Sequence, residues 1–196
     1  MKRRSVMRRL LFLVGLLGCH GKSTDAPPPL PLVQVHDASG AILAELRPIR
    51  PCRGSIGPVE LIVGGPPLVA QNGTTRWAGS SPGAGSATTI TRDDEKIARI
   101  ANQQAGAAVI DLQGVPVTRI AVAGQQATVL DAANTPLRTL TAKASQIDID
   151  QPAGTVTGTN DLVIAALLSA PEVVPELRIL AACERVLAPP LQAGRP

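Results

Sequence analysis

A hairpin pattern that recurs along the chain constrains the fold more than any other feature. Residues 109–120 read VIDLQGVPVTRI, two apolar segments around a turn that begins with aspartate. Residues 129–140, VLDAANTPLRTL, repeat the pattern 20 positions later, and residues 33–46, VQVHDASGAILAEL, carry an earlier copy. Alternating apolar positions on both sides of a turn are typical of antiparallel hairpins. Their repetition predicts a mainly β fold, either a barrel or a curled sheet.

The aspartates that begin these turns have a structural explanation. Asp37, Asp111 and Asp131 are each followed three positions later by glycine or asparagine. An aspartate carboxylate at the start of a turn accepts hydrogen bonds from nearby amides, and glycine or asparagine adopts a positive φ at low cost. A calcium or catalytic role is the alternative, but these turns lack the dense oxygen-ligand spacing of a calcium loop. We therefore expect the three aspartates to form turns.

The rest of the chain before residue 158 is less regular. Residues 53–90 are rich in Gly, Pro and Ser, and we expect a flexible loop at 79–86. Short strands are expected at four places: 59–63, 74–77, 145–150 and 155–157.

The C-terminal part of the chain changes to a helical pattern. Asp161 is a good helix cap, and residues 162–170 follow it with almost no polar side chain, which predicts a helix buried on all sides. Residues 176–187 predict a second, amphipathic helix with Cys183 on its inward face. The apolar stripe of that helix consists of Ile179, Ala182, Cys183, Val186 and Leu187. The fold class is therefore mainly β with one or two C-terminal helices, an α+β architecture.

Aromatic side chains are nearly missing from the sequence. The chain has no Tyr, one Phe and one Trp, which are Phe12 and Trp77. Sites for sugars and for single-stranded nucleic acids usually stack their ligands on several aromatic rings. Trp77 alone supplies at most one anchor, and a place in the core or at its rim explains it more simply.

The N-terminus has the composition of a secretory signal. Five basic residues precede an apolar run at residues 10–17. This run is too short to span a bilayer, because a membrane-spanning helix needs about 20 apolar residues. The sequence Leu16-Leu17-Gly18-Cys19 resembles the lipobox of bacterial lipoproteins. The resemblance implies cleavage after Gly18 and acylation of Cys19, whereas an ordinary cleaved signal with a chance cysteine is the alternative. Position 20 is His rather than the Asp that favours inner-membrane retention in lipoproteins, so outer-membrane delivery is preferred.

The signal divides the chain into four parts and changes its charge. We expect a signal peptide at 1–18, a Pro-rich extended tether at 19–31, the β-rich domain at 32–188 and a loose tail at 189–196. The signal holds five basic and no acidic residues, so the formal net charge of +4 becomes −1 in the mature chain. A high pI that comes from the signal is no evidence for nucleic-acid binding.

A second, fainter resemblance concerns the domain as a whole. Residues 111–120 and 131–140, followed by the apolar segment 162–170, are similar to the tubby, LURP-one and scramblase-related group. The resemblance covers residues 32–170 and implies a β-barrel that encloses a C-terminal helix. Domains of the tubby type bind acidic lipid headgroups through basic patches. That function is not expected here, because the mature chain is slightly acidic.

The remaining cysteines suggest a cross-link. Cys52 and Cys183 are the only cysteines after Cys19, and an exported chain meets an oxidising compartment. A disulfide between them is predicted, and two buried free thiols are the alternative. A catalytic cysteine is not expected, because His36 is the only histidine in the domain.

One pair of carboxylates is a candidate acid site. Asp148 and Asp150 alternate with isoleucines, so on a strand both carboxylates lie on one face. The simpler interpretation is the solvent-facing side of an edge strand. A single domain histidine also argues against a histidine-rich metal centre. We predict no cofactor and no metal.

These observations predict a lipid-anchored envelope protein, on the outer membrane and facing the periplasm, that acts as a non-enzymatic binding or structural module. Its partners would be the membrane, through the lipid on Cys19, and an envelope protein, but not nucleic acid. A carrier of a small apolar or lipid ligand is the first alternative, and an apolar cavity beside residues 162–170 would favour it. An enzyme of unfamiliar type using Asp148 and Asp150 is the second, and a filled core would favour the structural module.

Overall fold

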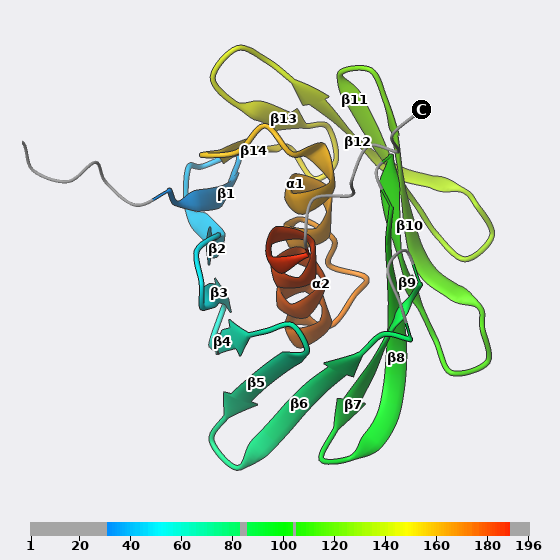
Figure 1. The fold of residues 1–196 in the computed structure, drawn as a ribbon. Coiled ribbons are helices and arrows are strands. Elements are labelled where there is room, and N and C mark those ends of the chain that lie inside the picture. The colour runs from blue at the N-terminus through cyan, green and yellow to red at the C-terminus, as the bar shows by residue number, and fades with distance from the viewer. Residues whose placement is uncertain (1–30, 83–85, 104, 189–196) are drawn as a thin grey trace, which may run out of the picture.

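The computed structural model describes residues 31–82, 86–103 and 105–188. Within these residues, 14 strands form one closed antiparallel barrel around two C-terminal helices, so the predicted mainly β fold is confirmed (Figure 1). The strands are β1 Val33–Asp37, β2 Ile42–Arg47, β3 Cys52–Ile56, β4 Val59–Gly64, β5 Leu68–Asn72, β6 Thr75–Ser80, β7 Thr88–Arg92, β8 Glu95–Gln103, β9 Gly106–Ile110, β10 Pro116–Ala123, β11 Gln126–Leu130, β12 Pro136–Ala142, β13 Ile147–Ile149 and β14 Gly154–Thr157. The helices are α1 Leu162–Leu168 and α2 Pro175–Leu187.

The barrel is a simple meander. Each strand pairs with the next strand along the chain, and β14 returns to pair with β1, with Val35 opposite Val156. Closure leaves no unpaired strand edge on the sheet. Because direction alternates from strand to strand, the hairpin turns fall at two ends. We call the end with the Asp37, Asp111 and Asp131 turns the loop end, and the opposite end, where β1 begins and α2 finishes, the terminal end.

Two helices fill the interior of this barrel. A barrel of about eight strands is filled by its own side chains, whereas wider barrels leave internal space. Here α1 packs against β10, β11 and β12, and α2 packs against β3, β4 and β8. Every residue of α1 is buried, as its uniformly apolar sequence requires. The helices therefore provide the core that a barrel of this width cannot provide from its strands alone.

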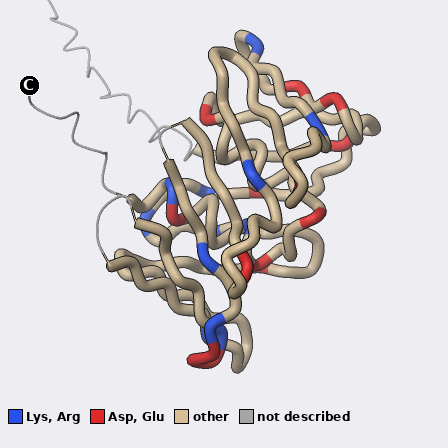
Figure 2. Tube along the Cα trace, turned by 90° about the vertical axis from the view of Figure 1, so that its right-hand side faces the viewer, with Lys and Arg blue, Asp and Glu red and all other residues tan. Residues whose placement is uncertain are grey.

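The three turn aspartates do what their position predicts. One carboxylate oxygen of each aspartate accepts hydrogen bonds from the amides two and four residues further on, at 2.7–2.9 Å. The matching residues Gly114 and Asn134 have φ angles of 87° and 64°. Figure 2 shows acidic positions on hairpin turns of the barrel. The predicted turn role of Asp37, Asp111 and Asp131 is confirmed.

Residues 53–90 contain more strands than the two that the sequence predicted. Besides the two strands expected there, this stretch contains most of β3, all of β5 and most of β7. Its glycines are packing positions rather than loop residues: Gly54 in β3 faces α2, and Gly79 in β6 faces Leu68 and Thr88. Composition alone does not separate these uses of glycine, because only the closed barrel shows which backbone segments another element approaches.

The second helix is not amphipathic in its surroundings. The predicted stripe residues Ile179, Ala182, Cys183 and Leu187 are fully buried and Val186 is half-buried, but Leu180, Ala181 and Arg178 are buried as well. Because α2 lies inside the barrel, several of its polar side chains contact the barrel wall and are only partly exposed to water. This enclosure brings the charged residues of α2 into the candidate sites described next.

Candidate functional site: a buried arginine beside a cavity at the loop end

The C-terminus of α1 is held by two arginines. The last carbonyls of a helix lack partners within the helix and must be satisfied otherwise. Arg178 of α2 donates from Nε to the Leu167 carbonyl at 3.3 Å and from Nη2 to the Leu168 carbonyl. Arg138 of β12 donates from Nη1 to the Ser169 carbonyl. These bonds fix the α1–α2 connection, residues 169–174, against the loop end of the barrel.

Among the described residues, one carboxylate forms an ion pair with these two cations. Arg138 Nη2 lies 2.7 Å from Glu172 Oε2, with side-chain exposures of 6% and 20%. Thr118 adds a longer hydrogen bond, from Oγ1 to Glu172 Oε1 at 3.4 Å. Arg178 is 8% exposed, and burial lowers the pKa of its guanidinium to about 10, with Arg138 adding to the effect and Glu172 opposing it. Arg178 is therefore still charged at neutral pH, and the cluster carries one positive charge in excess.

A cavity of about 250 Å³ lies next to Arg178. Its walls are mainly apolar and include Val35, Ile56 and Ile149, which are at most 7% exposed. Leu43 lines it too and is 47% exposed. The remaining lining residues are His36, Asp37, Pro152, Ala153, Gly154, Ser169 and Pro171. The cavity thus lies between the barrel wall and the end of α1, with one buried charge in an apolar surround.

The polar residues on the rim are already engaged. His36 Nδ1 lies 3.2 Å from the Gly40 carbonyl. Asp37 accepts bonds from the side chain and the backbone of Ser39, and these bonds, with the Ser39 hydroxyl contributing most, lower the pKa of the Asp37 carboxyl. Ser169 Oγ donates to the Ala166 carbonyl at 3.2 Å. Arg178 is therefore the polar group that distinguishes this cavity.

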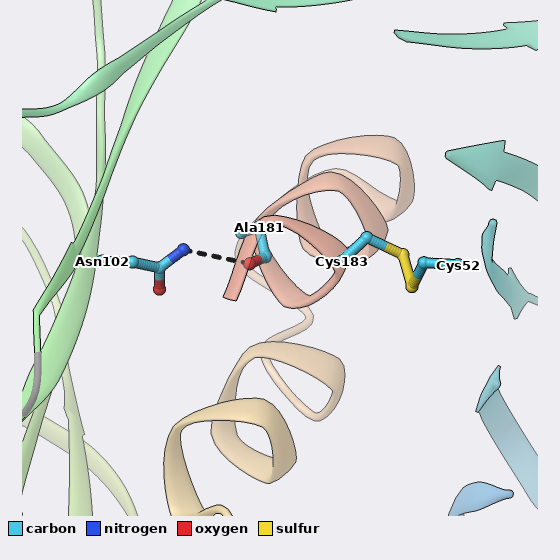
Figure 3. The surroundings of a disulfide bond; sticks show 4 residues. All are labelled: Cys52, Asn102, Ala181 and Cys183. Atoms are coloured by element: carbon cyan, nitrogen blue, oxygen red, sulfur yellow. Dashed lines mark hydrogen bonds between the residues drawn. A yellow bond between two sulfur atoms is a disulfide. The ribbon is translucent and has the colours of Figure 1, made fainter. Parts of the chain in front are cut away.

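A second buried polar cluster holds α2 from the opposite side of the barrel. Glu184 accepts hydrogen bonds from the Thr88 hydroxyl and from Asn102 Nδ2 at 2.7 Å. Asn102 Nδ2 also donates to the Ala181 carbonyl at 3.1 Å (Figure 3). Burial raises the pKa of the Glu184 carboxyl, and the bonds from Thr88 and Asn102 oppose that rise. This cluster ties α2 to β7 and β8.

The predicted cysteine pair lies on the other side of the same helix. The structure joins Cys52 of β3 to Cys183 of α2 in a disulfide, with their Cα atoms 5.7 Å apart and 131 residues between them in sequence. Figure 3 shows the disulfide and Asn102 on opposite sides of α2. Arg50 adds a hydrogen bond from Nη2 to the Leu187 carbonyl at 3.0 Å. The helix is thereby fixed to the barrel wall on two sides.

The structure does not bring Asp148 and Asp150 to one acid site. Asp148 pairs with Lys143 and accepts a bond from Gln146 Nε2 at 2.7 Å, and its pKa is lowered, mainly by the hydrogen bond from Lys143. Asp150 lies in the β13–β14 turn and accepts a bond from the Thr139 amide at 2.7 Å. The interpretation of an edge strand is wrong, because β13 pairs with both β12 and β14 and the closed barrel has no edge.

Trp77 and the two ends of the chain were the other positions singled out by the sequence. Trp77 is 4% exposed, and the Arg92 guanidinium lies 5.9 Å from its ring centroid, so it is a core residue. Cys19, the signal, nearly all of the tether and the tail at 189–196 lie outside the described residues. In the part of the chain that the structure describes, no helix is long and apolar enough to cross a membrane. The same part contains no group of three His, Cys, Asp or Glu arranged to hold a metal ion.

Comparisons of the chain with family models, with curated proteins and with solved structures gave no match. The lipobox-like motif and the tubby-like resemblance therefore stay predictions. The sequence did not indicate the cluster of Arg138, Glu172 and Arg178. One signal was present: Arg178 precedes Ala182 by four residues, so it falls on the predicted inward stripe of α2, where a charged residue needs an explanation.

Proposed function

We propose that the protein is a lipid-anchored component of the cell envelope, acylated at Cys19 and delivered to the outer membrane, whose barrel faces the periplasm as a non-enzymatic binding or structural module. The observation that supports this role most is the interior of the barrel. Both helices are buried within it, and the Cys52–Cys183 disulfide fastens α2 to β3. A filled, cross-linked interior favours a rigid platform over a chain that opens and closes around a reaction.

The position of the chain ends supports the same arrangement. β1 begins at the terminal end of the barrel, so the predicted tether joins the domain there. The loop end, with its hairpin turns and the α1–α2 connection, is then the end farther from the lipid. A partner in the periplasm would meet the loop end first.

The anchor is tested by envelope fractionation of cells that produce the wild-type chain or Cys19→Ala, combined with labelling by an alkyne-bearing fatty acid. We expect the label and the membrane association to disappear together in Cys19→Ala. The matched control is Ser23→Ala, which changes a nearby residue of the predicted tether, leaves the disulfide intact and should keep the label. A Cys19→Ala chain that stays in the membrane fraction would refute the anchor.

A carrier of a small ligand is the second candidate, and one observation favours it. The cavity of about 250 Å³ is lined by apolar residues of the barrel wall and by Ser169, at the C-terminal end of α1. This is the place at which an apolar cavity was expected for a carrier. A platform and a carrier are compatible, because the cavity lies at the loop end while the interior below it is filled.

A further inference from the structure

We propose that the cavity at the loop end binds a small organic monoanion with an apolar body, a carboxylate that carries a short hydrocarbon chain, and that Arg178 receives the carboxylate. The inference rests on the binding role proposed above and gives that role a ligand class. It is carried by the excess charge of the buried cluster, by the free nitrogen of Arg178 and by the apolar walls.

The buried cluster around Arg178 carries an excess positive charge. A buried ion is costly unless an opposite charge or several hydrogen bonds compensate it. Glu172 is committed to Arg138 at 2.7 Å, and the structure records no ion pair for Arg178 among the described residues. The carbonyls of Leu167 and Leu168 compensate Arg178 in part, as dipoles rather than as a charge. One negative charge from a ligand would balance the cluster.

The Arg178 guanidinium lies where it can donate a hydrogen bond into the cavity. Nε and Nη2 of Arg178 point to the end of α1, and Nη1 has no hydrogen-bond partner among the described residues. Because Arg178 lines the cavity while it is only 8% exposed, a group that reaches it is itself shielded from water. Hydrogen bonds between a guanidinium and an anion are about twice as strong as neutral ones. The two existing bonds hold the guanidinium in place for the ligand.

The cavity is small and mainly apolar. Its volume of about 250 Å³ is just below the roughly 300–1,000 Å³ of ordinary small-molecule sites. Val35, Ile56 and Ile149 offer an apolar wall, and Leu43 extends that wall to the surface. An inorganic anion would leave this wall uncovered, and a neutral hydrocarbon would leave the charge unpaired. An amphiphilic monoanion satisfies both.

Asp37 also lines the cavity and would repel an anion. Asp37 is partly exposed and its carboxylate is engaged by Ser39, so solvent and salt screen it, whereas Arg178 is buried and is screened less. The attraction of the nearby buried charge therefore outweighs the repulsion of the exposed one.

The test is calorimetric titration of the full chain carrying Cys19→Ala, which is not acylated and keeps every residue of the barrel. Octanoate is compared with octan-1-ol and octylammonium, which share its chain length but not its charge. We expect saturable 1:1 binding of octanoate, at least about tenfold tighter than either control, as one charge-assisted hydrogen bond provides. Butanoate, which has the charge but little apolar surface, should also bind more weakly.

Two variants separate the ligand site from the structural role of Arg178. Ala153→Trp places a large side chain in the cavity lining and leaves Arg178 unchanged, so it should abolish octanoate binding without lowering the melting temperature. Ala133→Trp, on the exposed β11–β12 turn away from the cavity, is the matched control and should bind normally. Arg178→Met should abolish binding as well; if that chain fails to fold, Ala153→Trp still decides.

Absence of saturable octanoate binding, equal binding of octan-1-ol, or unchanged binding by Ala153→Trp would each overturn the proposal. Failure of the anchor is distinguishable, because labelling at Cys19 is measured in cells and does not depend on octanoate. A labelled chain that ignores octanoate refutes the ligand alone, and an unlabelled chain that binds it refutes the anchor alone.

Discussion

Gly54 of β3 and Ile179 of α2 approach each other so closely that no side chain fits between them. A Cβ atom placed on Gly54 would lie 2.7 Å from Ile179 Cγ2, closer than such atoms come in proteins. The disulfide joins Cys52, two positions before Gly54 on β3, to Cys183, four positions after Ile179 on α2. The glycine therefore lets α2 lie against β3 at the distance that the cross-link requires.

Gly54→Ala should destabilise the fold by about 1–3 kcal/mol, the usual cost of overpacking a core. In an Ile179→Ala background the Gly54→Ala change should cost less than in the wild type, because alanine lacks the Cγ1 and Cγ2 atoms that lie nearest to the added Cβ. Gly64→Ala is the control: the nearest atom to its Cβ is the Val69 carbonyl oxygen, at 3.7 Å. Urea denaturation of the wild type and of these variants measures the differences, and equal losses for Gly54→Ala and Gly64→Ala would contradict the close contact.

Removing the disulfide should lower the free energy of unfolding substantially. A bridge across 131 residues restricts the unfolded chain by about 4–5 kcal/mol in the entropic description. Cys52→Ala, Cys183→Ala and the double variant should lose the same amount, because each removes the same bond. Reduced wild-type protein should match them. Two reactive thiols in denatured, unreduced wild-type protein would show that the bridge does not form.

The buried Arg138–Glu172 ion pair should contribute more to the free energy of unfolding than the exposed Lys143–Asp148 pair. Arg138→Met removes the partner of Glu172 and the hydrogen bond to the Ser169 carbonyl. We expect a loss of about 3 kcal/mol, toward the low end for breaking a buried pair because Glu172 is 20% exposed. Lys143→Met breaks the exposed pair with Asp148, which should change stability by about 0–1 kcal/mol. Thermal and urea denaturation test both, and similar losses would contradict the assigned burial.

Glu184 should make stability depend on pH in a defined direction. Because burial raises its pKa in the folded chain, the folded state holds the proton at a pH where the unfolded state has released it. Its contribution to the free energy of unfolding is therefore fully present below the ordinary carboxyl pKa of 4.5 and falls as pH rises through the raised value.

The comparison chain is Glu184→Gln, which cannot titrate at this position. The stability of the wild type minus that of Glu184→Gln should decrease from acidic toward neutral pH, and urea denaturation at several pH values measures it. A difference that stays constant across this range, or that grows with pH, would show that the carboxyl is not shifted upward.

The repeated hairpins were predictable because their information is local. Asp111 and Asp131 each specify a turn within five residues, and α1 was predictable from its cap and its uniform apolar sequence. The strands β3 and β5 were not, because Gly54 and the prolines before Leu68 look like loop residues until α2 and the neighbouring strands are in place. The cavity and Arg178 were not predictable either, since they join β1, β14 and α2, which the sequence keeps far apart.

The pairing of β1 with β14 has a consequence for how the chain reaches its native state. The ring of strands cannot shut until its first and last members meet, yet both helices follow β14 in sequence and must end up inside. The sheet therefore has to remain open, or reopen, until the last segment of the chain has emerged and moved in. During that interval the unsealed sheet exposes two strand edges and its apolar inner face, which are the surfaces most prone to aggregation. A chain of this topology depends on prompt delivery of its own C-terminus.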